Sequence, residues 1–271
     1  MARKYTISIP LLIFLFLAIL FLLACSNQRM ARPDTLEAVT AQLDALLPDL
    51  LRKYRAPGAA VALVQDGKVA WAQGYGLANE ASGAPVTTET TFQVASLSKS
   101  ITAWGVMRLV EEGKIDLDAP VTHYLKSWRL PSSKLDPNGV TVRRLLSHTA
   151  GIAPWTHAGA PIEATLPAPA ELLSAEPLRL VRQPGEREVY TNGGYTLLEL
   201  LIEEVTGESF AAYMQREVLT PLGMLESTYL WRPDLRAALA TGYQVSGQPT
   251  EHRSYPAAAG GLYATVGDIA T

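Results

Sequence analysis

Ser96 and Lys99 stand three residues apart at the start of a long apolar segment of this 271-residue chain. On a helix this spacing places both side chains on one face, so the lysine amine can reach the serine hydroxyl. A serine is a weak nucleophile until a base takes its proton, and an amine whose pKa is depressed by burial can be that base. The free N–H groups of a helix N-terminus would also stabilise negative charge developing near Ser96. The pair therefore indicates nucleophilic catalysis.

A second candidate cluster, Tyr190-Thr191-Asn192, follows about ninety residues later, in a turn-rich segment just before a predicted helix. It is the only Tyr-x-Asn in the chain, and Ser-x-x-Lys also occurs once. Ser-x-x-Lys alone is a weak signal, since roughly one chance match is expected in a chain of this length. Its meaning therefore depends on the residues that accompany it.

Together with residues 145–152 (Leu-Leu-Ser-His-Thr-Ala-Gly-Ile) and 260–265 (Gly-Gly-Leu-Tyr-Ala-Thr), these motifs resemble the serine β-lactamase and penicillin-binding-protein superfamily. The most similar branch is that of class C β-lactamases, DD-peptidases and related esterases. The resemblance covers nearly all of the chain after Pro33. It implies an α+β fold, in which an antiparallel sheet flanked by helices accompanies an all-helical subdomain, with the C-terminal strands of the sheet missing.

By this resemblance, Ser96 is the acylated nucleophile and Lys99 assists its deprotonation. Tyr190 would shuttle the proton, and Asn192 would bind both Lys99 and the substrate carbonyl. Which of Lys99 and Tyr190 is the base stays open. No cofactor is expected, and the four histidines show no metal-binding spacing, so no metal site is expected either. His148 is expected to have a structural role at a turn, without a part in catalysis.

Two residues near these motifs leave weaker signals. Trp155 could flank the substrate cleft or serve as a hydrophobic surface anchor in the helical part, and the sequence favours neither. Glu188 stands where class A β-lactamases carry a catalytic glutamate, but Thr191 replaces the leucine of that pattern. Glu188 is therefore expected to be a solvated loop carboxylate.

The third motif of the family, Lys-Thr-Gly or a variant such as His-x-Gly, does not occur after Tyr190. By the resemblance it lies on a strand whose backbone N–H forms half of the oxyanion hole, and the N–H of Ser96 forms the other half. Losing one such donor costs about 2.7–4 kcal/mol of transition-state stabilisation. The chain is therefore expected to be a fragment or a remnant, poorly stable and weakly active or inactive.

Local patterns predict the elements that position these residues. Apolar side chains at helical spacing predict a helix over about 34–54 with Asp34 as its N-cap, and Asp66-Gly67 between two apolar runs predicts a β-hairpin. Further helices are predicted over 142–148, 170–180, 195–205 and 210–218. We expect one hydrolase domain, 34–271, with an α/β part (34–116 and 250–271) and a helical part (117–249).

The first 24 residues are predicted to be a lipoprotein signal peptide, and 25–33 a tether. Arg3 and Lys4 precede an apolar run that ends in Leu-Leu-Ala-Cys, which resembles the bacterial lipobox, so Cys25 is the expected lipidation site. An uncleaved transmembrane helix is the alternative. The expected location is the bacterial cell envelope, lipid-anchored, and Ser26 favours the periplasmic side of the outer membrane if the source is Gram-negative.

The composition is that of a globular protein. The chain is 48% hydrophobic with a formal net charge of −3, and it has no basic run, which argues against binding to nucleic acid. We expect a cofactor-free serine hydrolase that forms an acyl-enzyme with a small-molecule or peptide substrate, an ester, amide or β-lactam. Esterase or peptidase-like activity is favoured over a dedicated β-lactamase. The alternative is a non-catalytic, penicillin-binding-like protein that binds peptidoglycan or acts as a sensor. The sequence predicts no oligomeric state.

Overall fold

The computed structural model describes residues 35–271. The chain divides into two compact units, residues 1–46 and 47–271, and the boundary falls inside helix α2 (Leu36–Tyr54). The predicted signal peptide, the lipidation site Cys25 and the tether lie outside the described residues. No helix in the described part of the chain is long and apolar enough to cross a membrane.

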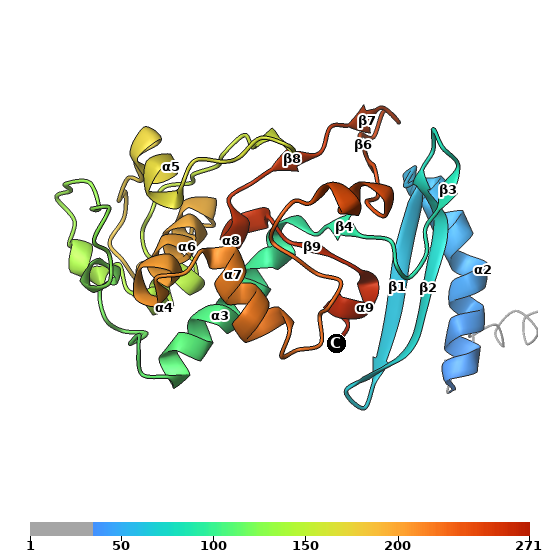
Figure 1. Ribbon diagram of the computed structural model, residues 1–271, viewed down its shortest axis with the longest axis horizontal. Helices are drawn as coiled ribbons and strands as arrows, with labels where there is room; N and C mark the ends of the chain where they lie inside the picture. The colour runs from blue at the N-terminus through green and yellow to red at the C-terminus, as the bar shows by residue number, and fades with distance from the viewer. Residues whose placement is uncertain (1–34) are drawn as a thin grey trace, which may run out of the picture. The chain divides into compact units, whose positions relative to one another are not determined.

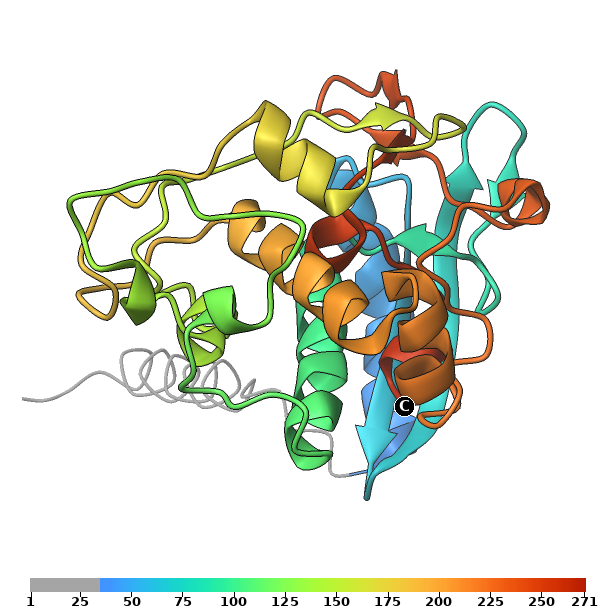
Figure 2. The same ribbon diagram turned by 60° about the vertical axis from the view of Figure 1, so that its left-hand side comes forward.

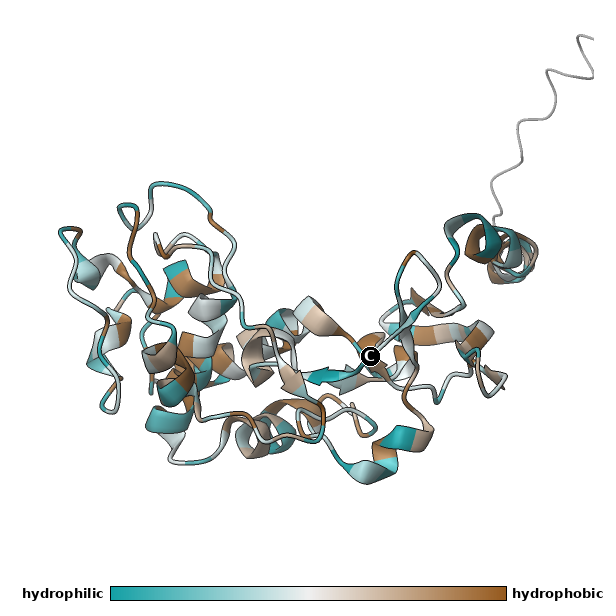
Figure 3. Cartoon of the chain, turned by 90° about the horizontal axis from the view of Figure 1, so that it is seen from above, coloured by the Kyte–Doolittle hydropathy of each residue, from teal (hydrophilic) through white to brown (hydrophobic). Residues whose placement is uncertain are grey.

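Helix α2 begins directly after Thr35. The Thr35 hydroxyl accepts a hydrogen bond of 3.2 Å from the N–H of Ala38, which supplies the acceptor that a first helical turn lacks. The predicted N-cap, Asp34, lies outside the described residues. Hydrophobic and hydrophilic segments alternate around α2 (Figure 3), as is typical of an amphipathic helix.

The predicted hairpin is present. Strand β1 (Gly58–Gln65) pairs antiparallel with β2 (Lys68–Asn79), and the two-residue turn Asp66-Gly67 has φ values of 52° and 70°. Positive φ at both positions is the requirement of a type I′ turn, whose twist matches that of the strands. Strand β3 (Ala84–Pro85) pairs with the other edge of β2, which gives the sheet order β1-β2-β3.

Gly76 in β2 is expected to tolerate no side chain. Its φ is 68°, and a Cβ added there would lie 2.2 Å from the carbonyl oxygen of Pro57. Gly76→Ala should therefore lower the free energy of unfolding by about 3 kcal/mol or more, because backbone strain adds to the clash. Gly83→Ala is the matched control, since Gly83 has φ 70° but open space around it, and it should cost only about 1 kcal/mol. Urea unfolding measures both, and equal losses would contradict the steric argument.

The rest of the described chain is mainly helical. Its α-helices are α3 (Ser98–Glu111), α4 (Val142–Leu146), α5 (Pro169–Ala175), α6 (Asn192–Thr206), α7 (Phe210–Met214), α8 (Ala257–Gly260) and α9 (Val266–Ile269). A π-helical turn, η4 (Gln215–Leu219), continues α7, and short 3₁₀ turns are η1 (Ala95–Leu97), η2 (Val121–His123), η3 (Pro137–Gly139) and η5 (Pro233–Ala237). The remaining strands are β4 (Phe92–Gln93), β5 (Ala160–Pro161), β6 (Gly242–Tyr243), β7 (Pro249–Thr250), β8 (Arg253–Ser254) and β9 (Tyr263–Ala264). The predicted α+β class is confirmed.

Helix α6 is central to the core. Every residue from Gly193 to Ile202 is buried, and the helix ends at Gly207, which has φ 73°. Helix α8 contacts both α6 and α3, as Figures 1 and 2 show from two sides. These three helices bring residues that are far apart in the sequence into one cluster.

The last residues return to the strand that precedes Ser96. Strand β9 pairs antiparallel with β4, and helix α9 packs on β1 and β2. The region expected to be all-helical also contains short strands, because β5 pairs with β8 and β6 pairs with β7. The Arg253 side chain reinforces the β5–β8 pair by donating to the carbonyl oxygens of Ala158 and Gly159, both at 2.9 Å.

Candidate active site

Ser96 lies in a tight 3₁₀ turn, η1, immediately before α3. This differs from the expected first turn of an α-helix. The Ser98 hydroxyl explains the difference, because it donates to the Ala95 carbonyl at 2.6 Å and accepts from the N–H of Leu262 at 3.0 Å. Ala95 has φ 47°, an unfavourable value for a residue with a side chain. Such strain often occurs at functional sites.

The structure brings together all four residues that the sequence selected for the site. The Ser96 hydroxyl is 2.7 Å from the Tyr190 hydroxyl and 3.2 Å from the Lys99 amine. Lys99 also donates to the side-chain oxygen of Asn192 at 2.8 Å and to the Ala259 carbonyl at 2.6 Å. The lysine is buried, while Ser96 and Tyr190 are exposed and open to a substrate.

Thr191 fixes the Tyr-x-Asn segment at the start of α6. Its hydroxyl accepts from the N–H of Gly193 at 3.3 Å, as an N-cap, and from the N–H of Trp155 at 3.1 Å. Trp155 is buried, and its indole N–H donates to the Glu176 carbonyl at 2.8 Å. Trp155 is therefore a core anchor for the site loop and does not flank the cleft.

His148 packs on the Tyr190 ring. Its ring centroid lies 4.5 Å from that of Tyr190, and its Nδ1 accepts from the N–H of Thr191 at 3.4 Å. Burial is the main cause that lowers the pKa of His148, and the positive charge of Lys99 is the second. The negative charge of Glu188 acts in the opposite direction. His148 is thus neutral at physiological pH and supports Tyr190 by contact, which fits the expected structural role. Glu188 is exposed, as expected of a solvated loop carboxylate.

Burial and charge tune the lysine and the phenol in a coupled way. Burial lowers the pKa of Lys99, because desolvation disfavours its charged form, and the partner Tyr190 partly opposes this. Burial alone would raise the pKa of Tyr190, but Lys99 and the Ser96 hydroxyl outweigh it, and the net pKa lies below the ordinary value. The ammonium also lies 4.9 Å from the Tyr190 ring centroid. Both shifts make proton transfer near neutral pH easier.

A small pocket of about 150 Å³ opens beside Ser96. Its walls include Asn192, His157, Tyr255, Pro256 and Gly260. His157, Tyr255 and Pro256 were not identified from the sequence, because they come from two loops that only the β5–β8 pairing brings together.

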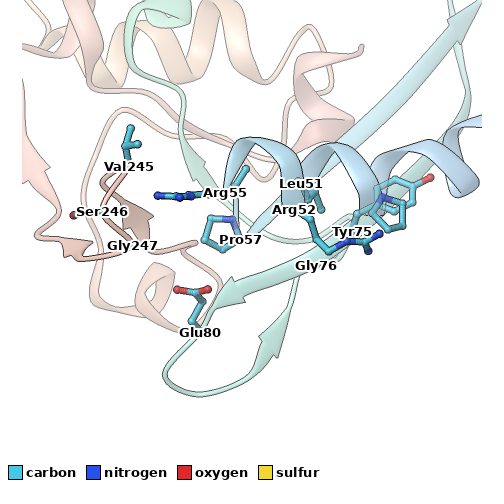
Figure 4. Close-up of a pocket in the computed structure, with 12 residues that line it drawn as sticks. Leu51, Arg52, Arg55, Pro57, Tyr75, Gly76, Glu80, Val245, Ser246 and Gly247 are labelled. Atoms are coloured by element: carbon cyan, nitrogen blue, oxygen red, sulfur yellow. The ribbon is translucent and has the colours of Figure 1, made fainter.

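A larger pocket of about 470 Å³ lies elsewhere, among Leu51, Arg55, Pro57, Tyr75 and Val245 (Figure 4). None of the four candidate catalytic residues lines it. Within residues 35–271, no group of three or more His, Cys, Asp or Glu side chains is placed to hold a metal ion.

Comparison with known proteins agrees with this geometry. A family model described as Beta-lactamase matches residues 43–271. The chain belongs to the beta-lactamase family. This confirms the resemblance found in the sequence.

Two curated relatives of this beta-lactamase-family chain are an esterase and a protein named flp. The chain is 30% identical over 207 residues to Esterase EstB of Burkholderia gladioli. The aligned region covers 71% of this chain and 52% of the esterase. The chain is also 26% identical over 227 residues to Protein flp of Staphylococcus aureus (strain MRSA252), and that aligned region covers 76% of this chain and 41% of Protein flp. The chain thus spans about half the length of the curated relatives it matches.

Solved structures show the same fold. The octameric penicillin-binding protein homologue from Pyrococcus abyssi matches with a TM-score of 0.73 and 32% identity, covering 85% of this chain and 55% of that one. A class C beta-lactamase in complex with cefoxitin matches with a TM-score of 0.73 and 26% identity, covering 86% of this chain and 64% of the beta-lactamase. The beta-lactamase fold is therefore shared over most of the chain.

Proposed function

We propose that this protein is a serine hydrolase that forms an acyl-enzyme at Ser96. The observation that carries the proposal is the cluster at Ser96, in which a phenol at 2.7 Å and a buried amine at 3.2 Å contact one exposed hydroxyl. A nucleophile within hydrogen-bond reach of a base, itself oriented by a third group, is the usual arrangement for covalent catalysis. The family's esterase and class C β-lactamase members support the same class of chemistry.

Tyr190 is the proposed proton acceptor. Its hydroxyl is closer to Ser96 than the Lys99 amine is, and two other acceptors, on Asn192 and Ala259, already hold Lys99. A proton passes most readily along the shorter hydrogen bond. Lys99 then acts by its charge, because the ammonium lowers the pKa of the phenol.

The proposed reaction has two halves. In the first, Ser96 Oγ attacks the substrate carbonyl carbon and its proton passes to Tyr190, which then protonates the leaving group as the carbonyl–leaving-group bond breaks. In the second, water attacks the acyl carbon while Tyr190 takes its proton, the bond from the acyl carbon to Ser96 Oγ breaks, and Tyr190 passes that proton to Ser96 Oγ. The acyl group leaves as a carboxylic acid. The Asn192 amide faces the same pocket and is placed to orient the substrate carbonyl.

Carboxylic esters are the proposed substrate class, with D-amino-acid peptides and β-lactams as the competing possibilities. The 30% identity to an esterase is the main support for esters. The pocket beside Ser96 is small, about 150 Å³, which favours a short acyl group.

Labelling with a fluorescent fluorophosphonate and with a fluorescent penicillin tests the proposal. A Ser96-dependent band that forms with either probe, together with turnover of p-nitrophenyl butyrate, is the expected result. A permanent penicillin label without turnover of ester or nitrocefin would instead indicate the sensor alternative. Absence of any label would exclude acyl transfer.

Lipid anchoring at Cys25 is a further part of the proposal. Its support is the position of the lone cysteine at the end of the apolar N-terminal segment. Incorporation of radioactive palmitate by expressing bacteria should depend on Cys25 and be lost in Cys25→Ala. Equal incorporation in both proteins would exclude this anchor.

A further inference from the structure

Glu199 is a carboxylic acid in the middle of the core helix α6, and the proposed reaction does not use it. The residue is 8% exposed, and its neighbours Leu198 and Leu200 are buried as well. Its Oε2 accepts a hydrogen bond of 2.9 Å from the N–H of Ala258. A carboxyl group is costly to bury, so the backbone N–H groups of Ala257 and Ala258 that bind it indicate where it acts.

Both N–H groups belong to the short helix α8. The helix has four residues, and Pro256 before it provides no side-chain cap. Its own residues are alanines and a glycine, so none of them can satisfy the N–H groups of the first turn. Glu199 supplies this acceptor from the neighbouring helix α6 and thereby fixes α8 in place.

The carbonyl groups of α8 in turn hold the catalytic helix α3. Ala258 accepts from the Thr102 hydroxyl at 3.0 Å, and Ala259 accepts from the Lys99 amine at 2.6 Å. The Ala259 contact is the shortest that Lys99 makes, compared with 2.8 Å to Asn192 and 3.2 Å to Ser96. The position of α8 therefore sets the position of the amine.

The spacing along α6 supports the same connection. Asn192 and Glu199 are seven residues apart, two helical turns, so both project from one face. Asn192 holds Lys99 directly, and Glu199 reaches it through α8. We propose that Glu199 is a positioning residue that fixes the Ala259 carbonyl, and through it Lys99, for acyl transfer at Ser96. The proposal rests on the serine-hydrolase function proposed above.

Glu199 holds α8 mainly in its neutral form at physiological pH. Burial raises the pKa of Glu199 to about 8, although the N–H groups of α8 act in the opposite direction. Glu203, one turn further along α6, also raises the pKa of Glu199. The buried phenol of Tyr229, in the chain after η4, interacts electrostatically with Glu199 as well. Lys99 lies on α3 and donates to the Ala259 carbonyl of α8, and α8 carries no titratable side chain. Glutamine reproduces the neutral acid, so Glu199→Gln should keep the acceptor.

Three variants of the full chain test the role. Glu199→Ala removes the acceptor and Glu199→Gln keeps it, while Ile202→Ala is the matched control because Ile202 is fully buried in the same helix but carries no polar group. Hydrolysis of p-nitrophenyl butyrate is measured per Ser96 site titrated with fluorophosphonate. We expect kcat to fall about tenfold or more in Glu199→Ala with little change in KM, and to stay within about threefold of wild type in the other two at pH 6–7.

Equal losses of kcat in Glu199→Ala and Ile202→Ala would show that Glu199 only packs, and would overturn the proposal. If Glu199→Ala does not fold, Glu199→Met decides, because methionine fills similar space without a strong hydrogen-bond acceptor. Glu199→Met should lower kcat about tenfold or more, and a kcat within about threefold of wild type would overturn the proposal.

The two proposals can fail separately. A wild-type chain that hydrolyses esters while Glu199→Ala matches it refutes only the positioning role. A wild-type chain that neither reacts with the probes nor hydrolyses the ester refutes the hydrolase function.

In that case the positioning role is tested by NMR, because the signal of the Lys99 amine in protein labelled at lysine reports the surroundings of that amine. A shift of the Lys99 signal in Glu199→Ala, absent in Ile202→Ala, supports the positioning role, and equal spectra refute it.

Discussion

Ser96→Ala is expected to abolish both fluorophosphonate labelling and ester hydrolysis, with kcat/KM reduced by about 10⁴-fold or more. In the proposed reaction the Ser96 hydroxyl is the atom that becomes acylated, and it lies 2.7 Å from the Tyr190 hydroxyl and 3.2 Å from the Lys99 amine. Tyr190 and Lys99 would remain in place, so the loss measures the nucleophile alone. The measurement is the initial rate of p-nitrophenyl butyrate hydrolysis, together with gel fluorescence of the labelled band.

Ser100→Ala is the matched control for this experiment. Ser100 is an exposed serine in α3, four residues after Ser96, and the Tyr190 hydroxyl is hydrogen-bonded to Ser96 instead. Its replacement should leave labelling and turnover within about twofold of wild type. Labelling that persists in Ser96→Ala would place the nucleophile elsewhere and would remove the basis of the proposed function.

Lys99→Met is expected to lower the acylation rate by about 10³-fold at pH 7 and to displace the pH–rate profile to higher pH. Burial raises the pKa of Tyr190, and the Lys99 ammonium, together with the Ser96 hydroxyl, holds it below its ordinary value. Without that charge the phenol pKa rises, less phenolate is present at neutral pH, and proton removal from Ser96 slows. Methionine keeps the apolar stem, so the fold should tolerate the change.

Pre-steady-state release of p-nitrophenol between pH 6 and 10 measures this effect. Lys114→Met is the control, because Lys114 follows the same helix but is exposed and pairs with Glu112 at 2.9 Å. It should leave the profile unchanged. Acylation by Lys99→Met within about threefold of wild type at pH 7 would rule out the assigned role of the amine.

The local elements could be predicted because their causes are local. Asp66-Gly67 specifies the hairpin, since only small or flexible residues take the two positive φ values that its turn requires. The apolar periodicity of α6 predicted a helix over 195–205, and the observed helix is Asn192–Thr206. The predicted start is late by three residues, because Asn192 and the two glycines after it are weak helix formers and Thr191 supplies the cap.

The chemistry of the site could also be predicted from the sequence, because it depends on side-chain types at fixed spacings. Ser96 and Lys99 are one turn apart, so no distant contact is needed to bring them together. Tyr190 and Asn192 required the family resemblance, since nothing local states that residues 94 positions away meet Ser96. The helical contacts among α3, α6 and α8 supply that meeting.

What only the tertiary structure decided is how Lys99 is held. Its closest partner is the backbone carbonyl of Ala259, a group that every residue possesses, so no residue type could have revealed it. Glu199 was equally hidden, because a glutamate in a helix usually faces solvent, and only the packing of α8 against α6 makes it a buried cap. The sequence by itself determined which groups can react, because reactivity belongs to side-chain types and spacing. Folding alone decided which backbone atoms and buried acids orient them, because those contacts depend on where distant segments pack.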